Sequence, residues 1–426
     1  MFLIVDSNIL LSYPQILQDK ENDIVLITDV LKELDGLKKN ENAETAFKAR
    51  RAAIVISRNI SKIIFVDEYD KQRMTVDEKL LAAAQSILEH DEVCLITNDV
   101  YLKVQATLKH IPTKGYGGSE DYSGVKTIYI TPDENGYHSE LDSLLSENKL
   151  LIEQNSLREN EFLIVKNLTN PIKNKNGTDD YEVLYIGICR NGKVHQINDS
   201  KTFNQIVIEN RWTGKTKPRN PEQICLCYLL SQRSVSIIYG GGTWGCGKSY
   251  LANNFAIQEL EQGKIAKIVY VPNNAYTMNT MELGALPGDT LDKVIGQIGP
   301  LIDLIGIDEI HRLIEEERLE VVPMSSMRGR SFNDAFIIVN EAQNLTEDHV
   351  KLLIGRCGDN SRIYFDGDIK QTDSSVFRNC NGLRLLTHLS LSDTYAPLFG
   401  TVRLSTIERS KTAQAAGYLD ELTGKL

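Results

Sequence analysis

The sequence predicts an α/β protein with a parallel sheet and flanking helices at each end of the chain and a small β-rich connector between them. Short apolar runs alternate with amphipathic helical patterns in both end regions, and such alternation produces parallel strands. Between about residues 161 and 210 the pattern changes to short strands with polar turns. The C-terminal half also contains a glycine-rich loop between an apolar run and a helical pattern.

The composition is that of a globular protein of two or three domains, because 42% of the 426 residues are hydrophobic and 25% are charged. No apolar run approaches the length of a membrane span, and Met1 leads directly into a strand-like run, so we expect no membrane segment and no signal peptide. The seven cysteines form no C-x-x-C pair, which favours reduced thiols and a cytoplasmic location. The net charge of −11 does not favour nucleic-acid binding, but a metal-dependent nuclease needs carboxylates and only local basic patches.

Changes of pattern divide the chain into three expected parts. These are an N-terminal domain at 1–131, a linker and small β-rich connector at 132–210, and a C-terminal domain at 211–426. The strands expected in the three parts are 2–5, 24–27, 62–66, 93–97 and 126–130; 162–166, 181–188 and 193–197; and 235–239, 266–270 and 336–339. A helical patch is expected near 139–154 and a polar hairpin tip at 174–180.

Four acidic residues of the N-terminal part lie where a parallel sheet can bring them together. Asp6 follows the first strand, and Asp99 follows the strand at 93–97. Asp77 begins a helix, and Glu33 lies about one turn inside another. Because parallel strands end at a common edge, the four can converge on a divalent cation such as Mg²⁺ or Mn²⁺, which can activate water to cleave a phosphodiester. Taken alone, Asp77 is explained more simply as a helix N-cap and Asp99 as a turn residue, and only the order and spacing of the four acids favour a site.

The glycine-rich loop matches the phosphate-binding pattern G-x-x-x-x-G-K-[ST]. Its glycines allow backbone N–H groups to surround phosphates at a helix N-terminus, whose dipole favours anions. Lys248 is expected to reach the β- and γ-phosphates of ATP, and Ser249 to hold Mg²⁺. The other loop residues expected to contact the nucleotide are Gly242, Thr243, Gly245, Cys246 and Gly247. The motif predicts a nucleotide-binding protein.

The order of the four acids resembles that of the PIN-domain nucleases over residues 1 to about 110. The site of that family consists of an acid after strand one, a Glu before Leu on a helix, an Asp before an I/L-L-x-A helix, and a [TS]-x-D after a later strand. The matching residues are Asp6, Glu33, Asp77 and Asp99, with Thr97 and Asn8 at the positions of polar helper residues. The resemblance implies a PIN-like fold in which the four acids bind metal and Asp6 and Asp99 take part in catalysis.

Further motifs follow the glycine-rich loop in a fixed order, at 283–289, 327–330, 336–344, 367–371, 402–404 and 408–410. This series resembles the PhoH-like ATPases, whose core is similar to the RecA/helicase-like motors of superfamily 1 helicases. The resemblance implies that Glu341 polarises the attacking water and that Gln371 senses the γ-phosphate. It also implies that Gln223 holds the adenine and that Arg409 is an arginine finger. With its N-terminal part, nearly the whole chain resembles PIN–PhoH fusion proteins.

The C-terminal part departs from the PhoH-like pattern at two places. Asn340 replaces the aspartate of the Walker B motif, and Val271-Pro272 replaces an expected Arg-Pro. An amide lacks the negative charge that orients Mg²⁺ and its water. We therefore expect ATP binding through Lys248 and Ser249 with weakened hydrolysis, and we expect Asn340→Asp to raise the ATPase rate.

The chain contains one P-loop core, so the outer face of the nucleotide stays open unless another subunit covers it. We therefore expect a homo-oligomer such as a hexameric ring, with an arginine acting across the interface. The candidates for this role are Arg328, Arg356, Arg403 and Arg409. The basic stretch 211–219, with Trp212, is a candidate contact for single-stranded nucleic acid, and a linker with solvated lysines is equally ordinary.

Together these features predict ATP-dependent nucleic-acid processing, in which a motor translocates along or unwinds single-stranded RNA and a metal-dependent endoribonuclease cleaves it. The choice of RNA over DNA rests on the family resemblance, because the cleavage chemistry needs no 2′-hydroxyl. Two alternatives stay open. One is a nucleotide-regulated RNA-binding switch with slow or no ATP hydrolysis, which Asn340 favours. The other is a motor with an inactive PIN domain, against which the intact set of four acids argues.

Overall fold

The computed structural model describes residues 1–19, 22–40, 43–66, 74–116, 122–132, 141, 157–173, 179–272, 298–372, 381–409, 412 and 415. The chain forms two compact units, Met1–Ser119 and Glu120–Leu426. In the described part, no helix is both long enough and apolar enough to cross a membrane. Three expectations lie wholly or mostly outside the described residues: the helical patch near 139–154, the hairpin tip at 174–180 and the motif at 283–289.

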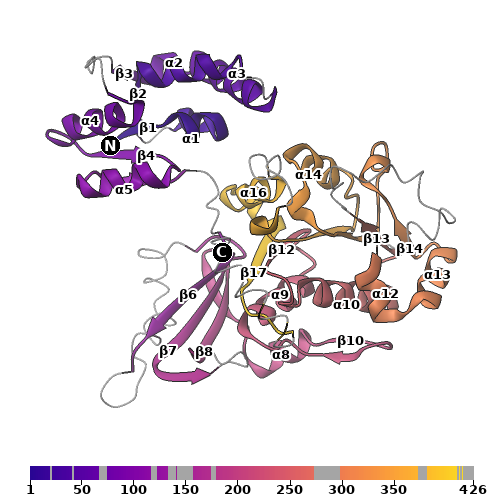
Figure 1. The fold of residues 1–426 in the computed structure, drawn as a ribbon. Helices are drawn as coiled ribbons and strands as arrows, with labels where there is room; N and C mark the ends of the chain where they lie inside the picture. Colours follow the sequence, from indigo (N-terminus) through magenta and orange to yellow (C-terminus); the bar gives the residue numbers. More distant parts are fainter. Residues whose placement is uncertain are drawn as a thin grey trace. The chain divides into compact units, whose positions relative to one another are not determined.

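The first unit is a parallel sheet with the strand order β3-β2-β1-β4-β5 and helices around it (Figure 1). Its elements are β1 (Phe2–Val5), α1 (Ser7–Ser12), η1 (Pro14–Gln18), β2 (Asp23–Ile27), α2 (Thr28–Leu37), α3 (Ala43–Arg58), η2 (Ile60–Lys62), β3 (Ile63–Val66), α4 (Val76–Leu88), β4 (Val93–Ile96), α5 (Val100–Leu108) and β5 (Thr113–Lys114). The strand β4, which pairs with β1 and β5, is buried at all its residues, which explains why it is a continuous apolar run. The first four expected strands are confirmed.

The strand expected at 126–130 forms as β6 (Val125–Ile130), but it does not extend the first sheet. It pairs in parallel with β7 (Phe162–Lys173) in the second unit. The fifth strand of the first sheet is instead β5, which we did not expect from the sequence. The expected domain boundary at residue 131 therefore falls inside the second unit, because a short apolar run does not specify its partner strand.

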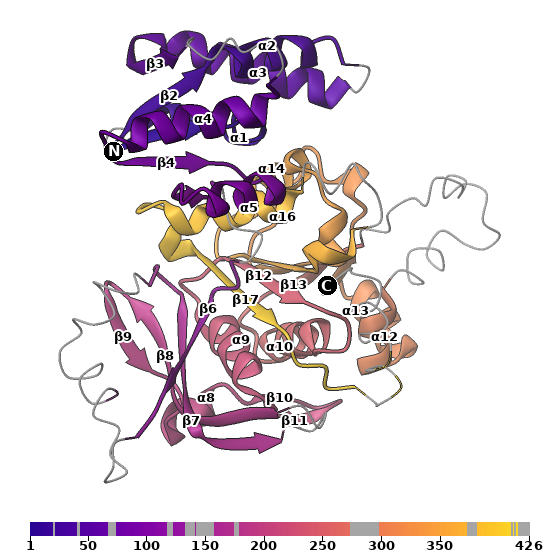
Figure 2. The ribbon, with the colours of Figure 1, turned by 60° about the vertical axis from the view of Figure 1, so that its left-hand side comes forward.

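The strand β6 belongs to a four-stranded sheet with the order β6-β7-β8-β9 (Figure 2), completed by β8 (Asp179–Arg190) and β9 (Lys193–Gln196). The strands expected in the β-rich region are confirmed. This sheet is bonded to the C-terminal part of the chain. The Nδ2 atom of Asn160 donates to the carbonyl oxygens of Ala396 and Phe399, at 2.9 and 2.7 Å.

The C-terminal sheet is parallel, with the order β14-β13-β15-β16-β12-β17. The elements of this region are α8 (Ser200–Gln205), β10 (Ile208–Asn210), β11 (Gly214–Thr216), α9 (Pro221–Ser231), β12 (Ile237–Gly242), α10 (Lys248–Glu261), β13 (Lys267–Val271), α12 (Gly299–Ile305), α13 (Ile307–Glu315), β14 (Leu319–Val321), η5 (Met324–Ser326), β15 (Ala335–Val339), η6 (Ala342–Asn344), α14 (Glu347–Ile354), β16 (Arg362–Gly367), η7 (Ile369–Gln371), α16 (Gly382–Thr387), η8 (His388–Leu391), η9 (Ala396–Leu398) and β17 (Phe399–Leu404). The strands expected here are confirmed as β12, β13 and β15.

Two hydrophobic cores cover the two faces of this sheet. The helices α9 and α10 lie on one face and α14 and α16 on the other (Figures 1 and 2), and their side chains belong to the two cores. Because the strands are parallel, the carboxyl ends of β12, β15 and β16 lie at one edge of the sheet. The segments that follow these three strands contain the candidate site. The fold is therefore the predicted α/β class.

Candidate functional site

The glycine-rich loop connects β12 to α10. Gly242, Gly245 and Gly247 adopt positive φ angles of 124°, 73° and 97°, which favour glycine. Gly247 is the N-cap residue of α10, and in the described chain no side chain caps this helix end. The backbone N–H groups of the first turn are thus available to an anion. The loop has the backbone geometry of a phosphate site.

The ammonium group of Lys248 lies against the carbonyl side of the loop. Its Nζ atom donates to the carbonyl oxygens of Gly242 and Thr243, at 2.6 and 3.0 Å. The thiol of Cys246 donates to the same Thr243 oxygen at 2.8 Å. A phosphate can replace these carbonyls as the partner of Lys248, since a charged acceptor makes the stronger hydrogen bond.

The segments after β15 and β16 reach the same loop. Gln371 Nε2 donates to Thr243 Oγ1 at 3.4 Å. Glu341 has a φ of 52°, which is strained for a residue with a Cβ, and it accepts from Gln343 Nε2 at 2.5 Å. Gln343 Oε1 accepts from the backbone N–H of Asp368 at 3.3 Å, so the two segments are bonded to each other. All of these residues except Thr243 line one pocket.

Gln223, the expected adenine contact, packs directly on the loop. It is 3% exposed, and its Nε2 atom donates to the carbonyl oxygen of Cys246 at 2.8 Å. Its Oε1 atom accepts from the backbone N–H of Arg219, also at 2.8 Å. These bonds use one of its two amide protons and one acceptor site, which leaves one of each for a base.

The segment after β17 passes next to the loop. The backbone N–H of Glu408 donates to the carbonyl oxygen of Gly245 at 2.9 Å. A Cβ added at Gly245 would lie 3.0 Å from Cδ of Arg409, so the arginine stem contacts the loop. Arg409 thus lines the pocket of its own chain. The sequence had suggested it as one of the arginines that act across a subunit interface.

A pocket of about 750 Å³ lies over these segments, within the size range of small-molecule sites. Part of the basic stretch 211–219 lines this pocket, through Lys215, Lys217 and Arg219. Trp212, the expected stacking residue, is half-buried, and the guanidinium of Arg211 lies 4.1 Å from its ring centroid. Arg211 itself is paired with Glu309 at 2.8 Å. The stretch therefore contributes mainly to the nucleotide pocket.

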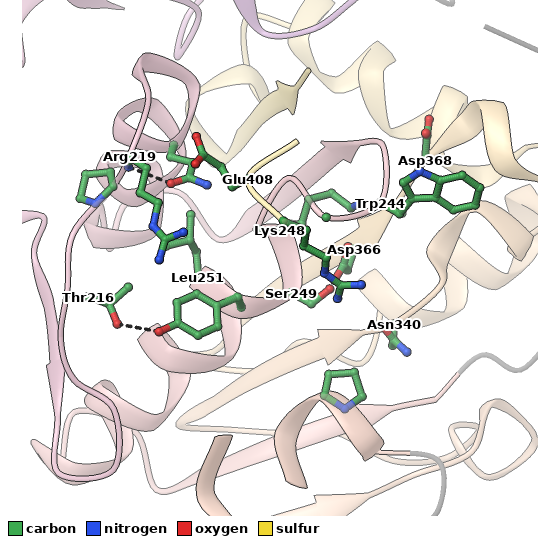
Figure 3. Close-up of a pocket in the computed structure, with 18 of the residues that line it drawn as sticks. Thr216, Arg219, Trp244, Lys248, Ser249, Leu251, Asn340, Asp366, Asp368 and Glu408 are labelled. Carbon is green, nitrogen blue, oxygen red and sulfur yellow. Dashed lines mark hydrogen bonds between the residues drawn. The ribbon is translucent and has the colours of Figure 1, made fainter. Parts of the chain in front are cut away.

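Asp366, the penultimate residue of β16, was not singled out from the sequence. It lines the pocket, as Ser249 and Lys248 do, and is 4% exposed. Burial raises its pKa, whereas the charge of Lys248 and the Ser249 side chain lower it. Figure 3 shows Asp366 beside Ser249 and Lys248, with Asn340 apart from them. The sequence signal was an acid at the end of a buried run, but only the strand order brings it to the loop.

In the first unit, Asp6 lies at the carboxyl end of β1 and is 5% exposed. Its Oδ2 atom accepts from Thr97 Oγ1 and from Asn8 Nδ2, both at 2.6 Å. These two donors also bond to each other at 3.2 Å. Burial raises the pKa of Asp6, the Thr97 hydrogen bond lowers it, and the negative charge of Asp77 raises it further. The expected helper residues thus hold the first acid in place.

The other three acids differ in their surroundings. Asp77 lies in the first turn of α4, and burial and then the charge of Asp99 raise its pKa. Asp99 is the exposed N-cap residue of α5 and accepts from the backbone N–H of Leu102 at 2.9 Å. Glu33 is exposed on α2. Three of the four acids are therefore within electrostatic range of a neighbour, although no three His, Cys, Asp or Glu side chains of the described residues form a metal-binding group.

Comparison with known families assigns both units. A family model described as PIN domain matches residues 3–117, and one described as PhoH-like protein matches residues 215–416. A PhoH-like protein of Bacillus subtilis is 35% identical over 150 residues, which are 34% of this chain and 46% of that protein. The chain thus spans less than half of the length of this relative.

Two relatives that match a larger share of this chain carry the name Protein PhoH2. The one from Thermobispora bispora is 31% identical over 346 residues, 79% of this chain and 72% of that protein. The one from Bacillus subtilis is 24% identical over an alignment of 464 residues, which covers 98% of this chain and 99% of that protein. Among solved structures, the Pif1 helicase from Candida albicans matches 48% of this chain and 43% of its own, with 16% identity and a TM-score of 0.26.

Proposed function

The chain, with a PIN domain followed by a PhoH-like domain, belongs to the PhoH2 family, and we propose that it is an ATP-dependent enzyme of single-stranded RNA. The P-loop domain hydrolyses ATP to translocate along or unwind the RNA, and the PIN domain cleaves it as a metal-dependent endoribonuclease. One observation supports this proposal most directly. Lys248, Glu341 and Gln371 line a single pocket over the phosphate-binding loop.

In that pocket the loop N–H groups and Lys248 bind the phosphates of ATP. Ser249 would hold Mg²⁺, which would neutralise charge on the phosphates. Glu341 orients the attacking water, and its bond from Gln343 fixes the direction of its carboxylate. Gln371 contacts the γ-phosphate next to Thr243, and Arg409 stabilises the charge of the transition state.

In the PIN domain, Asp6, Asp77 and Asp99 hold Mg²⁺ or Mn²⁺, with Glu33 as the fourth proposed ligand. A cation bound there would supply an activated water and would neutralise charge on the leaving oxygen. The fit rests on the placement of the aspartates, because Thr97 donates to Asp6 Oδ2 at 2.6 Å and accepts from the backbone N–H of Asp99 at 3.0 Å. Carboxylate oxygens are also the hard donors that these cations prefer. The hydrogen bond from Thr97 Oγ1 favours the ionised form of Asp6 that a metal ion requires.

The substrate proposed is single-stranded RNA, and DNA differs from it at this site only by a 2′-hydroxyl that the cleavage chemistry does not use. We further propose that the protein is a homo-oligomer, such as a hexameric ring, and that it works in the cytoplasm.

Asn340 supports a second candidate function, a nucleotide-regulated RNA-binding switch with slow or no ATP hydrolysis. The exposed position of Glu33 favours the third, a motor with an inactive PIN domain. The second candidate differs from the main proposal in the rate of ATP hydrolysis. The third differs in that the RNA is not cleaved.

The test is cleavage of an end-labelled single-stranded RNA with Mn²⁺, with and without ATP. Asp99→Asn is the nuclease blank, because asparagine is as good an N-cap residue as aspartate and the start of α5 is retained. Lys248→Ala is the blank for the motor. We expect cleavage that requires Asp99 and that ATP changes only when Lys248 is present.

Each other result selects an alternative. Cleavage that is indifferent to ATP contradicts the coupling of the two domains. RNA binding that depends on ATP, without cleavage, selects the switch. ATP hydrolysis stimulated by RNA, again without cleavage, selects the motor with an inactive PIN domain.

A further inference from the structure

The P-loop site lacks a charge where such sites usually have one. In P-loop ATPases the hydroxyl of the loop Ser or Thr and an aspartate after a neighbouring strand hold Mg²⁺ together. In this chain the residue after β15 is Asn340, whose amide cannot supply the negative charge. A site that binds Mg²⁺ with ATP therefore needs a carboxylate from elsewhere.

The strand order places such a carboxylate, that of Asp366, next to the phosphate-binding loop. The strand β16 lies between β15 and β12, so its carboxyl end is one strand closer to the phosphate-binding loop than that of β15. Asp366 is opposite Gly240 in the parallel register of β16 and β12. The loop begins two residues after Gly240. Asp366 is thus adjacent to the loop, whereas Asn340 is separated from it by a strand.

The contacts of Asp366 fit the role of a cation ligand. Asp366 is 4% exposed, and it lines the same pocket as Ser249, the residue expected to hold Mg²⁺. It also lies within electrostatic range of Lys248. Figure 3 shows Asp366 beside Ser249 and Lys248, and Asn340 lies apart from these three residues. A hydroxyl and a carboxylate are the hard oxygen donors that Mg²⁺ prefers.

Burial gives a further reason. A buried carboxylate is costly unless it is well paired, and the ammonium group of Lys248, which lines the same pocket as Asp366, is bonded to the carbonyl oxygens of Gly242 and Thr243. A divalent cation at Ser249 would offset this cost. Asp366 therefore suits Mg²⁺ both by its negative charge and by its oxygen donors.

We propose that Asp366 replaces the missing Walker B carboxylate, so that the negative charge of the Mg²⁺–ATP site is supplied from β16 instead of β15. The proposal rests on the ATP binding proposed above. It reverses one expectation from the sequence, because Asn340 then does not leave the cation site without a charge.

The test measures Mg²⁺ affinity, with a fluorescent ATP analogue bound to the full chain and Mg²⁺ titrated in. We expect Asp366→Asn to weaken Mg²⁺ binding by about 10- to 100-fold, the effect of losing a partner in a metal site. The double variant Asp366→Asn with Asn340→Asp returns a carboxylate to the other strand, and we expect it to recover most of the affinity. Asp359→Asn, an exposed change of the same charge just before β16, is the matched control.

A second variant keeps the proposal testable if Asp366→Asn does not fold. Asn340→Asp alone retains Asp366, and we expect the affinity for Mg²⁺ and the ATPase rate to stay near those of the wild type. A tenfold or larger gain from this single change would overturn the proposal, and so would unchanged Mg²⁺ affinity in folded Asp366→Asn. Failure of the wild-type chain to bind the ATP analogue would instead contradict the proposed function itself.

Discussion

At the residue scale, one hydroxyl group links two of the proposed metal ligands. Thr97 is fully buried, donates to Asp6 Oδ2 at 2.6 Å and accepts from the backbone N–H of Asp99 at 3.0 Å. The carboxylate at the end of β1 and the N-cap residue of α5 are thereby held through a single side chain. The threonine two residues before Asp99 is therefore explained by its hydrogen bonds to both residues.

We predict that Thr97→Val lowers the free energy of unfolding by about 2 kcal/mol, because a hydrogen bond to a charged group contributes about 1.5–3 kcal/mol. The side chain keeps its shape but Asp6 loses a donor. A higher Mn²⁺ concentration is then needed for half-maximal RNA cleavage. Urea unfolding and a Mn²⁺ titration of cleavage measure the two effects. Thr97→Ser retains the hydroxyl, and equal behaviour of the two variants would contradict the role of this bond.

At the element scale, the start of β6 is in backbone contact with β17. The carbonyl oxygen of Gly124 accepts from Phe162 N, and that of Ser123 accepts from Arg403 N, at 2.8 and 2.9 Å. Gly124 has a φ of 70°, and a Cβ there would lie 1.8 Å from the carbonyl oxygen of Thr401. Two sheets of the second unit meet at this glycine.

Gly124→Ala is expected to lower the free energy of unfolding by about 2–5 kcal/mol, the sum of about 1–2 for left-handed backbone and about 1–3 for overpacking. Gly192 has the same φ of 70° but open space around it, so Gly192→Ala is expected to show only the backbone part. Denaturant unfolding of both variants separates the two contributions. Equal losses would mean that the contact with β17 does not constrain the fold.

At the scale of the whole molecule, the predicted oligomer has a geometric consequence. Arg409 lines the pocket of its own chain, and Arg403 lies 4.0 Å from Asp368 of the same pocket. Arg356 donates to the carbonyl oxygen of Arg330, whereas Arg328 is exposed. Among the four arginines considered, Arg328 is therefore the one that we expect to reach a neighbouring subunit.

Light scattering with ATP present is expected to give a mass several times that of one chain, and a monomer would contradict the oligomer. Mixing inactive variants then tests each arginine. Arg328→Ala subunits mixed with Lys248→Ala subunits should regain ATPase activity if Arg328 acts across the interface. Arg409→Ala subunits in the same mixture should not, because Arg409 serves its own pocket.

The sequence by itself determined the fold class, most strands, the phosphate-binding loop and the order of the four acids. Each of these depends on local patterns: alternation, a fixed motif spacing, or an acid after an apolar run. Only the tertiary structure decided that β6 joins the four-stranded sheet of the second unit and that Glu33 is exposed. It also decided that Arg409 lines the pocket of its own chain and that Asp366 lies beside Ser249. The reason is physical, because the order and register of parallel strands are set by packing between residues far apart in the chain, and no local pattern contains them.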